Sequence, residues 1–276
     1  MKKLFYNATI HTMDRGKTAK SLLIEEDRIL AVDCDPAAWT EDPDCEKIDL
    51  QGRAVLPGFH DSHQHFLCYA IDKEKIDFYN ARSVAEMAEM TRRYIRERSI
   101  PKGQWVQGGG WNENFFDVKK VPTRQQLDEI SPDKPVMFTR ACCSTAVANT
   151  AALKLAGIFE NPPKMSDGEI VLDEKGIPTG LLNERARFYV YDIIPNISKN
   201  DVKQLILEYQ EDLLKTGLTT VQTDDFKLWD ATFKDILQAY KELEQEGRLK
   251  VRFIQQLRLI DHKELDAYLA LGIKPY

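Results

Sequence analysis

The chain has 276 residues, a length that can bury a large core and can hold one barrel-sized domain or two smaller ones. Apolar residues make up 43% and charged residues 30%, a balance typical of folded proteins that excludes a disordered chain. The net charge of −6 is spread along the sequence without a basic stripe, so we expect no nucleic-acid partner.

The cysteines and the apolar runs indicate the cellular location of the protein. No apolar run approaches the roughly 20 residues of a membrane span, and the first residues lack the apolar stretch of a signal peptide. The five cysteines have no Cys-x-x-Cys spacing, and the adjacent pair Cys142-Cys143 would point to opposite faces of a strand. We therefore expect reduced thiols, a cytoplasmic location and no membrane partner.

The first part of the chain is predicted to be a small β unit over residues 1–55. Short apolar stretches predict strands over 4–12, 21–25, 29–32 and 47–50, and Glu26-Asp27 predicts a hairpin between the second and third of them.

The segment from Val55 to His65 is an apolar run that ends in three of the chain's five histidines. Side chains alternate along a strand, so His63 and His65 share a face and lie about 6.6 Å apart along it. Two imidazoles in this arrangement can bind one divalent metal ion and leave other coordination positions for water and substrate. The simpler alternative is that these histidines are polar residues at a strand end and bind no metal. The Pro57-Gly58 turn and Asp61 on the same face favour the metal site. A metallo-β-lactamase-type site is excluded, because no Asp-His pair follows.

The middle of the chain mixes helix and strand signals. A helix is predicted after the capping box at Ser83, and residues 104–111 are predicted to be a strand that runs into a glycine-rich loop. A short helix is predicted from Thr123, a strand over 135–141 and a helix over 145–156. Residues 169–172 and 177–182 are predicted to form a hairpin. The glycine-rich segment lacks the Lys-Ser/Thr ending of a phosphate-binding loop.

The last quarter alternates strands and helices. Helices are predicted over 200–215, 227–245 and after Asp261, and strands over 218–223 and 251–257. This alternation indicates parallel βα units.

Several ordered motifs resemble one protein family. Pro57-Gly-Phe-His-Asp-Ser-His-Gln-His65 resembles the first-strand motif of the amidohydrolase superfamily. Four further segments resemble motifs of its YtcJ-like branch, amidohydrolase family 3, which includes N-substituted formamide deformylases. They begin at Gly108, Arg140, Gly176 and Gly217. The resemblance covers the whole chain and matches the N-terminal half or so of a family member. One segment departs from the pattern, because Cys143 and Ser144 stand where the family has glycine and histidine.

The resemblance implies an α/β fold: a metal-dependent hydrolase (β/α)8 TIM-type barrel, incomplete here, with a β-sandwich-like N-terminal unit. The barrel part would span 56–276, with strands at 55–65, 218–223 and 251–257 and an α+β insertion at about 80–200. The implied reaction is hydrolysis of a carbon–nitrogen bond in a small-molecule substrate such as an amide or formamide. It would use one or two divalent ions, most often zinc, and a metal-activated water. The family's other ligands and its catalytic aspartate lie on later strands, so no catalytic residue is assigned here.

Roles follow for individual residues. His63 and His65 would bind the metal, and Asp61 would either support a ligand or satisfy strand-end amides. Trp111 is either a wall of the substrate pocket or a core residue, and Glu184 either reaches the substrate or lies on a solvated helix face.

Two further acidic residues and the two histidines outside the metal strand also have predicted roles. Asp224 and Asp225 lie just past a strand end, where they would either contact substrate or cap the next helix. His262 is expected to be a solvated helix-start residue, and His11 to be structural or exposed. The alternative function is a non-catalytic remnant or interaction protein. Three βα units leave an unpaired sheet edge, which favours self-association into a homo-oligomer.

Overall fold

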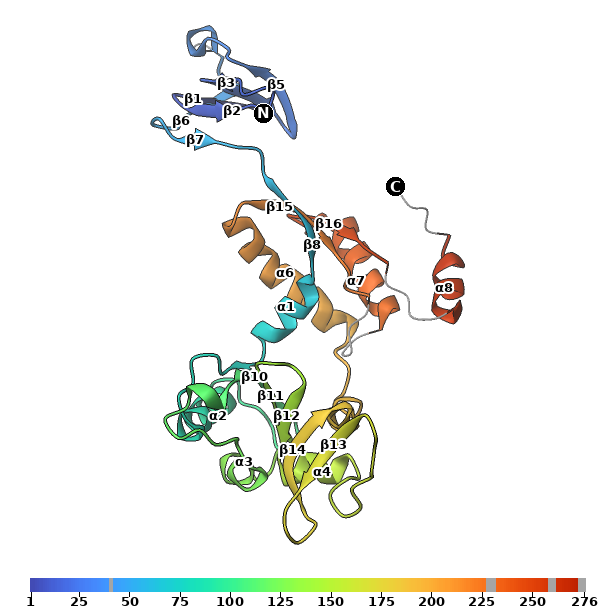
Figure 1. The fold of residues 1–276 in the computed structure, drawn as a ribbon. Coiled ribbons are helices and arrows are strands. Elements are labelled where there is room, and N and C mark those ends of the chain that lie inside the picture. Colours follow the sequence, from blue (N-terminus) through green and yellow to red (C-terminus); the bar gives the residue numbers. More distant parts are fainter. Residues whose placement is uncertain (40–41, 227–231, 258–261, 273–276) are drawn as a thin grey trace. The chain divides into compact units, whose positions relative to one another are not determined.

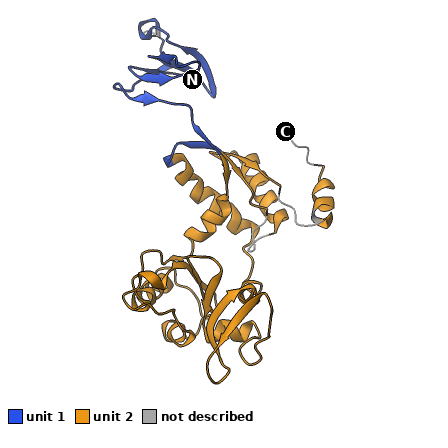
Figure 2. Cartoon of the chain, viewed as in Figure 1, with its two compact units in different colours: residues 1–61, 215–220 blue, residues 62–214, 221–276 orange. Residues whose placement is uncertain are grey.

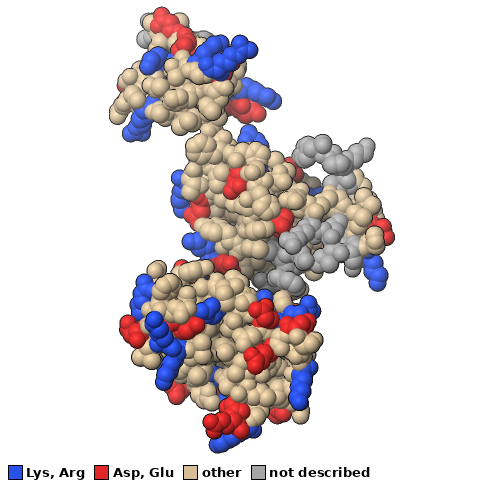
Figure 3. Space-filling view, viewed as in Figure 1, with Lys and Arg blue, Asp and Glu red and all other residues tan. Residues whose placement is uncertain are grey.

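The computed structural model describes residues 1–39, 42–226, 232–257 and 262–272 (Figure 1). The chain divides into two compact units (Figure 2). One unit contains residues 1–61 and 215–220, and the other contains residues 62–214 and 221–276. Acidic and basic side chains are mixed over the face in Figure 3. No helix in the described part of the chain is long and apolar enough to cross a membrane.

The first unit consists mainly of short strands. They are β1 (Lys2–Tyr6), β2 (Thr9–His11), β3 (Thr18–Ala19), β4 (Leu22–Glu25), β5 (Arg28–Val32), β6 (Cys45–Asp49) and β7 (Ala54–Val55), with the 3-10 helix η1 (Pro36–Trp39) before β6. They form a four-stranded sheet in the order β5-β4-β1-β6 and a three-stranded sheet in the order β3-β2-β7. Leu4 and Leu23 are buried between neighbouring strands of the larger sheet. The predicted hairpin is confirmed, since Glu25 pairs with Arg28 across an antiparallel turn.

The middle of the second unit is a six-stranded mixed sheet. Its order is β13-β14-β12-β11-β10-β9, with β9, β10 and β11 parallel and the other pairs antiparallel. The strands are β9 (Ile76–Asp77), β10 (Val106–Trp111), β11 (Val136–Arg140), β12 (Thr145–Ala148), β13 (Gly168–Leu172) and β14 (Pro178–Glu184). The helices are α2 (Val84–Glu97), α3 (Arg124–Ile130), α4 (Thr150–Leu155) and α5 (Phe188–Tyr191), with 3-10 turns η2 (Glu113–Phe115) and η3 (Arg185–Arg187).

Both faces of this sheet are covered, as strand alternation requires. Phe138 of β11 packs with Met87 of α2 in one core, and the neighbouring Met137 packs with Leu153 of α4 in the other. The predicted helix starts are confirmed: the Ser83 side chain accepts from the Glu86 N–H, and a complete capping box opens α3. The predicted hairpin of β13 and β14 is also confirmed.

Two predictions for this sheet are wrong. The glycines Gly108 to Gly110 belong to β10 and not to a loop, since β10 runs to Trp111 and pairs with β11. A side chain at Gly108 or Gly110 would meet an aromatic ring. The predicted helix over 145–156 begins only at Thr150, and Thr145–Ala148 is a strand paired with β11 and β14. Asn149 separates the two elements, since its side-chain oxygen accepts the Ala152 N–H as an N-cap.

The remaining elements are the predicted strands and helices of the βα units, together with a helix after the first strand that was not predicted. They are β8 (Phe59–Gln64), α1 (Phe66–Lys73), α6 (Lys199–Lys215), β15 (Leu218–Thr223), α7 (Phe233–Gln245), β16 (Arg252–Gln255) and α8 (His262–Leu269). The three strands form a sheet in the order β16-β15-β8, and the described residues contain no closed barrel. α1 packs against α6 through Ala70, Ile71 and Leu205. Two parts of the predicted helices lie outside the described residues. They are residues 227–231 of the helix predicted over 227–245, and the cap at 261 of the helix predicted after it.

The strands β8 and β15 run in the same direction, as predicted for βα units. Near their starts the Phe59 N–H donates to the Gly217 carbonyl at 2.8 Å. Past their ends the Phe66 N–H donates to the Thr223 hydroxyl at 3.0 Å. Gly58 permits the close approach, since a Cβ there would fall 2.2 Å from the Thr219 side chain.

Candidate metal centre

The two histidines of the predicted metal strand lie together. The ring centroids of His63 and His65 are 5.1 Å apart with an interplanar angle of 82°. Both residues are exposed on β8 and its C-terminal end. This arrangement agrees with the shared face that strand alternation predicts.

A third donor comes from the end of the neighbouring strand. Asp224 follows β15 directly, and its carboxylate accepts a hydrogen bond from Nδ1 of His65. The Asp224 side chain is only 8% exposed, whereas that of His65 is 53% exposed. Single donor atoms of His63, His65 and Asp224 all lie within 4.8 Å of one another. Two imidazoles and a carboxylate form a donor set that a divalent transition metal accepts.

His65 is also the residue at which α1 begins. It occupies the N-cap position, but its side chain makes no capping hydrogen bond because it is directed to Asp224. The first turn of α1 is capped from β15 instead: Thr223 Oγ1 accepts the Phe66 N–H, and Asp225 Oδ1 accepts the Leu67 N–H, each at 3.0 Å. The strand that supplies Asp224 therefore also fixes the backbone next to His65.

Asp225 is the buried centre of this capping network. Its carboxylate accepts hydrogen bonds from the hydroxyls of Thr223 and Tyr240, both at 2.7 Å. Burial raises the pKa of Asp225, although the hydrogen bonds from Leu67, Tyr240 and Thr223 act in the opposite direction. One role predicted for Asp224 and Asp225 was to cap the following helix. They do not, since α7 is capped by Thr232.

Trp111 lies in the core. Its side chain is fully buried, and its indole N–H donates to the Phe138 carbonyl at 3.1 Å. It packs in the same cluster as Phe78 and Met87. Of the two predicted roles, this full burial agrees with core packing.

The other predicted residues lie at more exposed positions. Asp61 is half-buried on β8, two residues before His63. Glu184 is exposed at the end of β14 and not on a helix face, with φ at 50° and its N–H donating to the Ser144 carbonyl at 2.7 Å. The roles proposed for these two residues stay predictions. His262 is exposed at the start of α8, and His11 is exposed on β2.

The segment that departs from the family pattern forms a turn after β11. Cys143 has φ of 59°, the left-handed region that favours glycine, which explains why the family pattern has glycine there. Burial raises the pKa of the Cys142 thiol, but hydrogen bonds from Ser144, Arg140 and Thr145 outweigh burial and lower this pKa to about 6. Arg140 also makes a two-pronged ion pair with Glu113, at 2.8 and 2.9 Å.

The strands, helices and donor cluster define an α/β protein with a group of side chains at the ends of neighbouring strands that could hold a metal ion. The sequence comparison identifies the family: the model of the amidohydrolase family matches residues 46–275. The chain belongs to this family, which confirms the resemblance seen in its motifs.

Several relatives show how much of a family member the chain represents. It is 29% identical to YtcJ of Bacillus subtilis over 97% of this chain and 50% of that protein. It is 33% identical to the N-substituted formamide deformylase of Arthrobacter pascens over 79% of this chain and 41% of that protein. The chain thus spans about half the length of the curated relatives it matches.

Solved structures support the same fold. A metal-dependent hydrolase from Pyrococcus furiosus matches all of this chain and 53% of its own, with a TM-score of 0.75 and 29% identity. A metal-dependent hydrolase from Pyrococcus horikoshii matches with a TM-score of 0.74 and 26% identity.

Proposed function

We propose that this chain carries part of the metal centre of a hydrolase that cleaves carbon–nitrogen bonds in small non-peptide molecules such as amides or formamides. The observation that carries the proposal is the convergence of His63, His65 and Asp224 at the ends of two neighbouring strands. The family and the named activity of the formamide deformylase relative support the substrate class. We place this activity in the cytoplasm.

The residues fit a divalent ion, and zinc is the ion that we propose. Two neutral imidazoles and one carboxylate are a frequent protein ligand set for catalytic zinc. When bound in such a site, zinc supplies an activated water and polarises the substrate carbonyl. We propose that His65 donates from Nδ1 to Oδ1 of Asp224, which leaves Nε2 of His65 and the second carboxylate oxygen of Asp224 for a metal.

The capping network keeps these donors in place. Thr223 and Asp225 hold the first turn of α1 through the Phe66 and Leu67 amides. Because His65 immediately precedes these amides, its backbone cannot shift without breaking buried hydrogen bonds. We propose that Thr223 and Asp225 position His65 and that they do not touch substrate.

The test of the metal assignment is elemental analysis of the purified chain after loading with zinc and removal of excess metal. His63→Ala and His65→Ala should each lower the bound zinc by about tenfold or more. His60→Ala is the matched control, since His60 is exposed on the opposite face of the same strand. Equal zinc content in all four proteins would refute the assignment and favour a non-catalytic interaction protein.

The test of the activity is release of formate from an N-substituted formamide by the zinc-loaded protein. Loss of this release in His65→Ala, with retention in His60→Ala, would support the proposed function. Zinc binding without release of formate would contradict activity of this chain by itself while leaving the metal site intact.

A further inference from the structure

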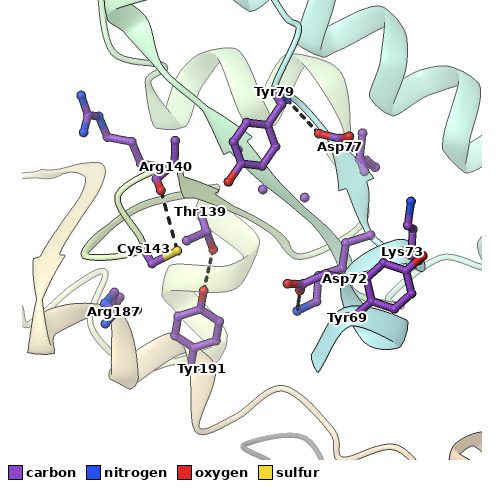
Figure 4. A pocket seen from close by; sticks show the side chains of 16 residues that line it. Tyr69, Asp72, Lys73, Asp77, Tyr79, Thr139, Arg140, Cys143, Arg187 and Tyr191 are labelled. Carbon is purple, nitrogen blue, oxygen red and sulfur yellow. Dashed lines mark hydrogen bonds and ion pairs between the residues drawn. The ribbon is translucent and has the colours of Figure 1, made fainter. Parts of the chain in front are cut away.

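A cavity of about 480 Å³ lies in the second unit, beside the six-stranded sheet (Figure 4). Its walls come from the end of α1, from β9, from the glycines of β10 and from the segment that follows β11. Three tyrosines line it, Tyr69, Tyr79 and Tyr191. The volume lies in the range of about 300–1,000 Å³ that is usual for small-molecule sites.

The floor of this cavity is backbone without side chains. A Cβ at Gly108 would fall 2.4 Å from the Phe78 ring, and one at Gly110 would fall 2.5 Å from the Tyr79 ring. Gly109 differs, since its nearest neighbour would be the Thr139 carbonyl at 3.9 Å. The space above Gly109 is therefore open, and a flat molecule can lie there against the peptide planes beside Tyr79.

Most charged groups around the cavity are already paired. Arg140 is held by Glu113, and the Lys75 ammonium lies 3.0 Å from the Asp72 carboxylate. The Lys73 ammonium lies 5.3 Å from the centre of the Tyr69 ring. Asp77 also lines the cavity and has the opposite charge to Lys73, so these groups together contribute little net charge to a ligand bound at the floor.

Arg187 is the exception. It is half-buried, its Nε donates to the Glu184 carbonyl at 3.0 Å, and its guanidinium lies 5.8 Å from the centre of the Tyr191 ring. Within the described parts of the chain, no carboxylate pairs with Arg187. A guanidinium in this state favours a carboxylate, which can accept two parallel hydrogen bonds from it.

A second polar group lies beside Arg187. The hydroxyls of Thr139 and Tyr191 are hydrogen-bonded at 2.5 Å, and either can be the donor. Whichever hydroxyl accepts this bond keeps its own hydrogen for another acceptor. In Figure 4 Arg187 and Tyr191 lie at one end of the cavity, while Asp72 and Asp77 lie at the other. The cation that favours an anionic group is therefore Arg187, at the end of the cavity away from Asp72 and Asp77.

We propose that this cavity binds a small aromatic monocarboxylate. The carboxylate accepts from Arg187 and from the Thr139–Tyr191 hydroxyl pair, and the ring lies over Gly109 beside Tyr79. The site uses none of the proposed metal-binding residues, so it stands or fails independently of the proposed hydrolase activity.

The test compares three probes of nearly equal shape by calorimetry or ligand-observed NMR. Benzoate should bind, the neutral benzamide about tenfold or more weakly, and the cationic benzylamine not detectably. Arg187→Gln should weaken benzoate binding by about tenfold or more and abolish the preference over benzamide. Arg185→Gln is the matched control, because Arg185 is an exposed neighbour paired with Asp167 at 2.9 Å. It should leave binding unchanged.

A second variant tests the position of the ring. It also keeps the proposal testable if Arg187→Gln does not fold. Gly109 has a backbone that other residues can adopt, so Gly109→Leu should fold, fill the cavity and abolish binding of both benzoate and benzamide. Circular dichroism checks the fold. Benzoate binding should persist after zinc removal and in His63→Ala, whether or not the proposed hydrolase activity is found. The proposal is overturned if benzoate does not bind at about 10 mM, or if Arg187→Gln and Gly109→Leu bind it as the parent does.

Discussion

Replacing Asp225 by alanine tests the network that fixes the backbone beside His65. The change removes the acceptor for three buried donors, the Leu67 N–H at 3.0 Å and the hydroxyls of Thr223 and Tyr240 at 2.7 Å. Each unsatisfied buried donor costs about 1–3 kcal/mol. The alanine variant also avoids the cost of burying the carboxylate, which the raised pKa of Asp225 reflects. We therefore expect the free energy of unfolding to fall by about 3–5 kcal/mol, less than the sum of three full penalties.

The assay is urea unfolding followed by circular dichroism, with hydrogen exchange at the Phe66 and Leu67 amides as the local measurement. Asp235→Ala is the control, because Asp235 is a half-buried carboxylate that accepts a hydrogen bond from the Thr232 hydroxyl at the start of α7. It should cost less than about 1 kcal/mol. A cost for Asp225→Ala no larger than that of the control, with both amides still protected, would refute the reasoning.

Two further predictions concern sites away from this network. In a Cys143→Ser background, alkylation of Cys142 by iodoacetamide should reach half its maximal rate near pH 6, because hydrogen bonds stabilise its thiolate. Ser144→Ala should move this midpoint to higher pH, and a parent midpoint near pH 9, the ordinary thiol value, would contradict the prediction. Gly58→Ala should lower the free energy of unfolding by about 1–3 kcal/mol, because its Cβ would fall 2.2 Å from the opposing threonine. Adding Thr219→Ala to Gly58→Ala should restore part of the lost free energy of unfolding. No restoration would contradict the proposed clash.

Local signals in the sequence predicted local structure well. Ser83 and Thr123 each start a helix because one hydroxyl satisfies an amide within three residues, which needs no knowledge of the rest of the fold. His63 and His65 share a face for a similarly local reason, the two-residue period of a strand. Family resemblance added the α/β class, which composition alone does not determine.

Features that depend on distant partners were not predictable in the same way. The alanines after Thr145 suggested a helix, but pairing with strands on both sides makes this segment a strand. Asn149 carried a usable signal, since asparagine is a preferred N-cap and places the helix start after it. Trp111 had two equally reasonable roles, and its burial depends on neighbours such as Phe138 that come from a different strand.

The adjacent acids Asp224 and Asp225 show why the proposed metal centre depends on the fold as well as on the motif. Both follow the same strand, yet Asp224 accepts from His65, whereas Asp225 accepts from the Leu67 amide in the first turn of α1. Their different roles arise because consecutive residues at a strand end point in different directions, while β8 and β15 end at the same level. A His-x-His pair becomes a three-donor cluster only where a second strand ends beside it. A search for the metal centre of a related chain should therefore begin with the residues that directly follow the strand paired with the His-x-His strand.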